Sequence, residues 1–141
     1  MSYQHKVQYY ETDRMGITHH SNYIRIMEEA RGEWMEQMGM SYETFEGLGL
    51  ISPVVNVSCN YKKTTTYNDI ITVTIYIIDC DHLKMRLAYD MRVQGEIVAT
   101  AISVHCFLED GTKPVSLKKR FPAVHAAYKA YEAQQGPIPF K

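Results

Sequence analysis

The sequence lacks most features that mark secreted, membrane-bound or nucleic-acid-binding proteins. Its three cysteines are widely spaced and form no CxxC motif, which argues against a disulfide framework and a zinc knuckle. The formal net charge is only -1, so no strong field favours nucleic acid or a membrane surface as a partner. No stretch approaches the ~18 apolar residues that a membrane span needs. The first residues also lack the apolar run of a signal peptide, so we expect a cytoplasmic protein.

Length and composition predict one globular domain. The chain has 141 residues, of which 45% are hydrophobic. A chain of this size buries roughly two thirds of its unfolded surface on folding, so a core can form without crosslinks. We therefore predict a single domain over residues 1–141, in which residues 131–141 form a loosely held tail.

Apolar periodicity predicts a long helix from Asn22 to Met38. One stripe of side chains recurs at steps of three and four residues: Tyr23, Met27, Ala30, Trp34 and Met38. Ser21 is expected to cap the start, and Gly39 is expected to end the helix in a left-handed conformation. Isoleucines beside the stripe widen the apolar surface, as is typical of a helix surrounded by a sheet.

Five segments have the pattern of strands. Four alternate between apolar and polar residues, and a fifth is continuously apolar or β-branched, which is typical of a strand covered on both faces. They span residues 3–10, 55–61, 70–78, 83–93 and 98–108. Turns are expected at Asp79–His82, around Gly95 and at Asp110-Gly111. Pro122 is expected to open a second helix and Gly136 to close it.

The order of these segments predicts an α+β fold. Short connections imply antiparallel neighbours, so we expect a curved antiparallel five-stranded sheet wrapped around one long helix, plus a C-terminal helix. One layer of sheet leaves its other face open. We therefore expect a homo-oligomer, either a dimer or a tetramer.

The loop before the long helix concentrates the candidate chemistry. It contains the carboxylate of Asp13, a glycine turn at Gly16 and two histidines, His19 and His20. A helix N-terminus carries unpaired N–H groups and about half a positive charge, which polarise a carbonyl oxygen. A carboxylate facing it can attack the carbonyl or take a proton from water. A thioester suits this arrangement, because its thiolate leaves without a strong acid or a metal.

A resemblance to a known family rests on this loop and the helix after it. The matching motif is Tyr10-x-x-Asp13-x-x-Gly16-x-x-x-His20-x-Asn22-Tyr23, followed by Glu28/Glu29-x-Arg31. It resembles the 4-hydroxybenzoyl-CoA thioesterase family, and especially the acyl-CoA thioesterase branch associated with the Tol-Pal envelope system. The resemblance runs from about residue 3 to residue 108. It implies a hotdog fold and hydrolysis of acyl-CoA to free acid and CoA, with no cofactor beyond the CoA of the substrate.

The resemblance also implies roles for single residues. Asp13 matches the catalytic aspartate, which acts as nucleophile or general base, and His20 matches a histidine near the reacting carbonyl. Four positions match the substrate-binding part of the motif: Gly16, Ile17, Asn22 and Tyr23. The sequence departs from the family at Glu11 and His19, where the branch often has an aspartate and an aromatic residue. These two departures bear on substrate preference.

Several interpretations stay open from the sequence. Basic side chains near strand ends could meet CoA phosphates, although solvent exposure is the simpler reading of Lys62, Lys63 and Arg86. The adjacent histidines lack a spaced third ligand, so we predict no metal site. Glu29 remains a weaker second carboxylate. Two alternatives to an acyl-CoA hydrolase also stay open: a thioesterase whose acyl group is carried by an acyl carrier protein, and a domain that binds acyl thioesters without hydrolysing them.

Overall fold

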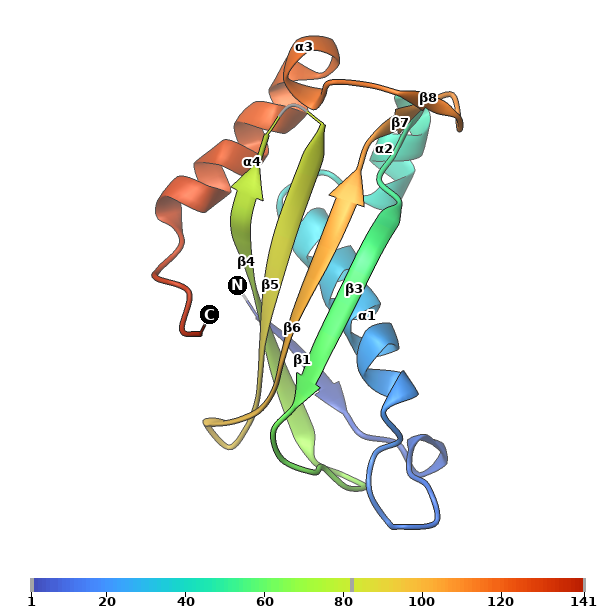
Figure 1. The fold of residues 1–141 in the computed structure, drawn as a ribbon, viewed down its shortest axis with the longest axis vertical. Coiled ribbons are helices and arrows are strands. Elements are labelled where there is room, and N and C mark those ends of the chain that lie inside the picture. The colour runs from blue at the N-terminus through green and yellow to red at the C-terminus, as the bar shows by residue number, and fades with distance from the viewer. Residues whose placement is uncertain (1, 82, 141) are drawn as a thin grey trace.

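The computed structural model describes residues 2–81 and 83–140. A five-stranded antiparallel sheet curves around one long helix, α1 (Ser21–Gln37), as Figure 1 shows. In spatial order the strands are β1 (Ser2–Lys6), β4 (Ile70–Cys80), β5 (Lys84–Val93), β6 (Glu96–Cys106) and β3 (Val54–Tyr61). The predicted sheet and central helix are confirmed.

Short elements complete the chain at one end of the sheet and along its side. After α1 come α2 (Tyr42–Gly47) and a small sheet of β2 (Leu50–Ile51), β7 (Leu108–Glu109) and β8 (Lys113–Pro114). They are followed by α3 (Leu117–Arg120) and α4 (Pro122–Gln134), which Pro122 opens as predicted. Among the described helices, none is both long and apolar enough to cross a membrane.

The predicted stripe of α1 forms the centre of the core. Its buried apolar side chains pack against the inner face of the sheet, and they are Tyr23, Ile26, Met27, Ala30, Trp34 and Met35. Trp34 also stacks on Tyr128 of α4, with ring centroids 5.7 Å apart. The helix ends before Gly39, which has the expected left-handed backbone with φ of 73°.

Two predicted element boundaries were wrong: the end of the first strand and the start of the long helix. The first strand stops at Lys6, because a 3-10 turn, η1 (Tyr9–Glu11), takes the place of its last residues. Ser21 does not cap α1: it is the first helical residue, and its hydroxyl pairs with His19 Nδ1 at 2.8 Å. Both differences come from side-chain bonds in the loop, which hydrophobic periodicity does not record. The predicted turn at Asp79–His82 ends at a residue outside the described part of the chain.

The two edges of the sheet differ in how they are covered. Along the upper half of β4, where β1 no longer pairs, α4 supplies the missing partners (Figure 1). Tyr131 Oη donates to Ile75 O at 2.7 Å, and the Gln135 amide bonds both N and O of Ile77 at 2.8 Å. Tyr131 therefore belongs to the packed helix and not to a loose tail.

At the other edge, β3 has no such cover. Three of its valines are 39–51% exposed, namely Val54, Val55 and Val57. An edge strand leaves a row of backbone N–H and C=O groups unpaired, which is a template for pairing with another chain. The contrast between the two edges makes β3 the open side of this sheet.

His105 of β6 is a buried titratable side chain. The structure places it on the inner face of β6, 3% exposed, beneath α1. Its Nε2 pairs with Ser103 Oγ at 2.8 Å, and that hydroxyl pairs with Tyr89 Oη at 2.7 Å. The other inner-face residues of β6 are small, so the sequence did not mark this face as apolar. Large side chains of the neighbouring strand β5 fill the space beside them.

Buried His105 makes stability depend on pH. Burial, together with the positive charge of Arg31, lowers the pKa of His105 to about 4 from its ordinary value of 6.5. Between pH 6.5 and about pH 4, His105 binds a proton in the unfolded chain but not in the folded chain. The free energy of unfolding therefore falls as the pH falls through this window. We expect this one group to account for roughly 3 kcal/mol across that window.

Urea denaturation of the wild type and of His105→Asn at two pH values measures this contribution. The wild type is expected to lose more stability than the variant between about pH 7 and about pH 4.5. Equal losses in the two proteins would show that His105 titrates normally in the folded state.

Candidate functional site

The loop that carries Asp13 is a closed turn. Thr12 and Thr18 form a bridge at its base, and Asp13 N donates to Ile17 O at 2.9 Å. Gly16 N donates back to Asp13 O at 2.9 Å, and Gly16 has φ of 79°. A residue with a side chain rarely adopts this backbone conformation, which explains the glycine in the motif. The turn holds Asp13 in one place relative to the start of α1.

A second loop, residues 62–66, supports this turn from below. Thr65 Oγ1 pairs with Thr18 Oγ1 at 2.6 Å and with Tyr23 Oη at 2.9 Å, and all three side chains are buried. Thr66 Oγ1 donates to Gly16 O at 2.8 Å. Burial raises the pKa of Tyr23, so its phenol keeps its proton. The three threonines thus tie the Asp13 turn to the sheet and to α1.

Between these loops, β3 and the start of α1 lies a cavity of about 300 Å³. We call it the Asp13 cavity, and its lining residues are Asp13, Met15, Ile17, Thr18, His20, Tyr23, Tyr61, Lys62, Lys63 and Thr64. Its size is near the lower end of small-molecule sites, roughly 300–1,000 Å³. The carboxylate, the imidazole and two lysines meet a wall of apolar side chains here.

Within this cavity Asp13 has one engaged oxygen and one open oxygen. Oδ1 accepts the N–H of Met15 at 2.8 Å, which is the turn-capping role open to any loop aspartate. Oδ2 bonds to none of the residues that the structure describes. The side chain is partly exposed and lines the cavity. One oxygen is therefore fixed by the loop while the other can meet a ligand.

The start of α1 contributes His20 and Tyr23 to the lining of the cavity. Asn22 N donates to His19 O at 3.0 Å and Tyr23 N to His20 O at 3.2 Å, so both groups already have acceptors. Among residues 2–81 and 83–140, no acceptor bonds to the backbone N–H of His20. Tyr61 Oη donates to His20 O at 3.2 Å. His20 precedes the first residue of α1 and lines the cavity, so the positive end of the helix dipole lies beside it.

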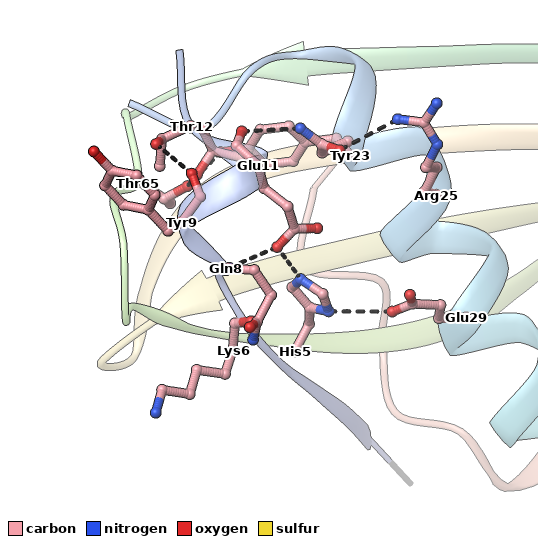
Figure 2. Close-up of polar contacts among 12 residues, drawn as sticks. His5, Lys6, Gln8, Tyr9, Glu11, Thr12, Tyr23, Arg25, Glu29 and Thr65 are labelled. Carbon is pink, nitrogen blue, oxygen red and sulfur yellow. Dashed lines mark hydrogen bonds and ion pairs between the residues drawn. The ribbon is translucent and has the colours of Figure 1, made fainter. Parts of the chain in front are cut away.

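A buried ion pair holds the chain just before Asp13, as Figure 2 shows. Glu11 Oε1 accepts from Gln8 N at 2.7 Å and lies 2.8 Å from His5 Nε2. His5 Nδ1 lies 3.1 Å from Glu29 Oε2, which also accepts from Tyr3 Oη at 2.6 Å. This network anchors η1 to β1 and α1.

Three predicted site residues stand outside the cavity lining, namely Gly16, Asn22 and Arg86, whereas the two predicted lysines belong to it. The Asn22 side chain is buried and donates to Glu11 O at 2.9 Å, so it holds the loop in place. Arg86 lies at the other end of β5, where it pairs with Asp79 at 2.5 Å. Lys63 lines the cavity but also pairs with Glu96. Lys62 lines it with no ion pair among the described residues.

Sequence reasoning missed two residues that shape the cavity. Tyr61 closes one wall, and its ring lies 5.2 Å from that of Tyr23. Thr65 is 2% exposed and carries the hydrogen bonds beneath the turn. The alternation of apolar and polar residues in its strand already placed Tyr61 at the end of the inner face. Nothing local distinguished Thr65 from the threonines on either side of it.

Comparison with known proteins identifies the family. A family model described as the thioesterase-like superfamily matches residues 7–129. A putative acyl-CoA thioesterase, YneP of Bacillus subtilis, is 36% identical over 125 residues, covering 87% of this chain and 91% of that protein. A putative esterase of Aquifex aeolicus is 38% identical over 117 residues, covering 83% and 91%. The chain belongs to the thioesterase-like superfamily.

A solved structure extends the likeness to three dimensions. The DHNA-CoA thioesterase of Staphylococcus aureus superposes with a TM-score of 0.87 at 31% identity, covering 94% of this chain and 90% of that chain. The predicted hotdog fold is confirmed, and so, at the level of the family, is the class of thioester hydrolase. The resemblance holds for the superfamily, whereas membership of the 4-hydroxybenzoyl-CoA thioesterase family and of its Tol-Pal-associated branch stays a prediction.

Proposed function

We propose that this protein hydrolyses acyl-CoA thioesters to a free acid and CoA in the Asp13 cavity. The observation that carries the proposal is that Asp13 lines a cavity of about 300 Å³ beside the start of α1, while its Oδ2 has no partner among the described residues. The names of the B. subtilis and S. aureus relatives, an acyl-CoA thioesterase and a DHNA-CoA thioesterase, support the same substrate class.

In the proposed reaction the thioester carbonyl lies between Asp13 and the start of α1. The positive end of the helix dipole and the His20 N–H stabilise the negative charge that develops on the carbonyl oxygen. Asp13 Oδ2 attacks the carbonyl carbon or takes a proton from the attacking water. The C–S bond then breaks and CoA leaves as a thiolate. Where Asp13 has attacked, water then hydrolyses the mixed anhydride between the acyl group and Asp13, which releases the acid and restores the carboxylate; where water has attacked, the acid forms directly. Ile17 and Tyr23 form the apolar side of the cavity for the acyl group.

Lysines at the rim supply the proposed contact for CoA. Lys62 lines the cavity and is free to meet a phosphate, whereas Lys63 must first leave Glu96. Arg86 is too far along β5 to reach the same cavity within one chain. The three cysteines are free, as suits the reducing cytoplasm in which we place the reaction.

We also propose that two copies of the chain associate through the β3 edge. The exposed valines of β3 and its unpaired backbone groups suit pairing with a second β3, whereas α4 occupies the edge beyond β1. Such a dimer places a partner chain next to Tyr61, at the wall of the Asp13 cavity. Light scattering is expected to give twice the chain mass of 16.3 kDa or a multiple of it. A monomer at micromolar concentration would contradict this arrangement.

A panel of acyl-CoA substrates tests the proposed activity. The purified protein is mixed with short, long and aromatic acyl-CoAs, and the released thiol is detected with a colour reagent. We expect saturable release from at least one member of the panel. The same acyl group on an acyl carrier protein tests the alternative carrier. Binding of the acyl-CoAs with no thiol release from either carrier would instead identify a non-catalytic binding module.

A further inference from the structure

Arg31 is a largely buried cation with no counter-charge. It lies in the third turn of α1, facing the sheet, and NH1 donates to Tyr89 Oη at 3.0 Å. No carboxylate of the residues that the structure describes lies within ion-pair distance of its guanidinium. Buried charges are usually paired, and a guanidinium has five N–H donors to satisfy. The chain leaves most of this donor capacity unused.

The neighbours of Arg31 do not supply the missing negative charge. Tyr89, Ser103 and His105 form a chain of neutral hydrogen bonds, with distances of 2.7 and 2.8 Å. The phenols of Tyr89 and Tyr42 raise the pKa of Arg31 although burial lowers it, so the side chain remains charged. An anion from outside the chain is the natural partner for this group.

Two adjoining cavities lead to the guanidinium. A small one of about 20 Å³ is lined by Arg31, Trp34, Met35, Tyr42, Ser52, Met85, Leu87, His105 and Tyr128. A second one, of about 270 Å³, is lined mainly by apolar side chains of α2 and β2: Tyr42, Phe45, Glu46, Leu50, Ile51, Ser52 and Pro53. Tyr42 and Ser52 line both, and the buried Ser52 Oγ has no hydrogen-bond partner among the described residues.

We propose that these two cavities form one binding site for a monocarboxylate with an apolar body. The carboxylate pairs with Arg31 and accepts the hydroxyl protons of Ser52 and Tyr42, while the body fills the apolar cavity over Phe45 and Leu50. The planar guanidinium matches a carboxylate in geometry. A phosphate, which is larger and more strongly hydrated, suits neither the small cavity nor its apolar neighbour.

Within one chain this Arg31 site is separate from the Asp13 cavity. The two share no lining residue. Arg31 lies eight residues beyond Tyr23, which corresponds to roughly 12 Å along α1. The proposed ligand class includes the acid that thioester hydrolysis releases, but the site stands on its own contacts and does not require that reaction.

Trp34 provides a built-in reporter for the experiment. It is the single tryptophan of the chain and lines the small cavity. We would follow its fluorescence while titrating octanoate or benzoate, with 1-octanol and benzyl alcohol as uncharged counterparts. We expect saturable binding of at least one acid, and roughly 10- to 100-fold weaker binding of the matching alcohol, because a bond to a charged group is lost. The octanoate and benzoate arms distinguish an aliphatic from an aromatic body.

Variants test whether Arg31 causes the preference for the acid over the matching alcohol. Arg31→Gln is expected to bind acid and alcohol equally, while Arg86→Gln, which removes an exposed arginine, keeps the wild-type preference. Should Arg31→Gln fail to fold, the acid–alcohol comparison on the wild type still decides the matter. Equal binding of acid and alcohol by the wild type, no saturable binding, or an unchanged preference in folded Arg31→Gln would each overturn the proposal. Asp13→Asn is expected to bind the acid normally, so loss of hydrolysis and loss of this site are distinguishable.

Discussion

Replacing Asp13 by asparagine is expected to lower the turnover number for acyl-CoA by about 10²–10⁴-fold. The amide can neither attack the thioester carbonyl nor accept a proton from water. Its oxygen can still accept the N–H of Met15, so the turn that holds the residue is kept. We expect the free energy of unfolding to stay within ~0.5 kcal/mol of the wild type, as for surface substitutions generally. Steady-state thiol release and urea denaturation measure the two quantities.

Asp69→Asn provides a matched control. Asp69 also caps a loop, because its Oδ2 accepts the N–H of Thr66 at 2.9 Å, but it does not line the Asp13 cavity. The same chemical change in the neighbouring loop should leave turnover near the wild-type value. If both variants lost activity equally, loop stability would explain the effect better than chemistry at Asp13.

The largest stability effect is expected for Glu11→Ala. Glu11 and His5 form an ion pair with side chains 7% and 10% exposed, and Glu11 also accepts the N–H of Gln8. Removing the carboxylate takes the acceptor away from both His5 Nε2 and Gln8 N, and each buried group left without its partner typically costs about 1–3 kcal/mol. We expect a loss of that order in the free energy of unfolding, measured with urea. Activity should fall as well, because η1 leads directly into the Asp13 turn.

Glu29→Ala is the comparison for this prediction. Glu29 bonds the other nitrogen of His5 at 3.1 Å, but its side chain is 48% exposed, so water can replace the contact. An exposed pair typically contributes less than about 1 kcal/mol. A similar loss of stability in both variants would show that burial does not set the strength of this network (Figure 2).

Hydrophobic periodicity was enough to predict the long helix and the strands. The stripe through Met27, Ala30 and Trp34 needed only its own spacing, and Gly39 and Pro122 marked helix ends by backbone chemistry alone. The start of α1 could not be found this way. Its boundary depends on His19, which binds the Ser21 hydroxyl that would otherwise cap the helix.

The candidate site was likewise predictable only where its residues are close together in the sequence. Asp13, Ile17, His20 and Tyr23 form a local motif, and the structure brings all four to one cavity. The contributions of Tyr61 and Thr65 come from more than 40 residues away, so only the folded sheet reveals them. Arg31 was part of the recognised motif, yet its missing counter-charge becomes visible only when its surroundings are known.

The most direct test of the central claim measures binding and turnover together on Asp13→Asn. The variant is mixed with the best acyl-CoA of the panel, and bound ligand and released thiol are recorded on the same sample. The account predicts that the acyl-CoA binds with near wild-type affinity and stays intact over many wild-type turnover times. Release of thiol at a rate close to that of the wild type would contradict it.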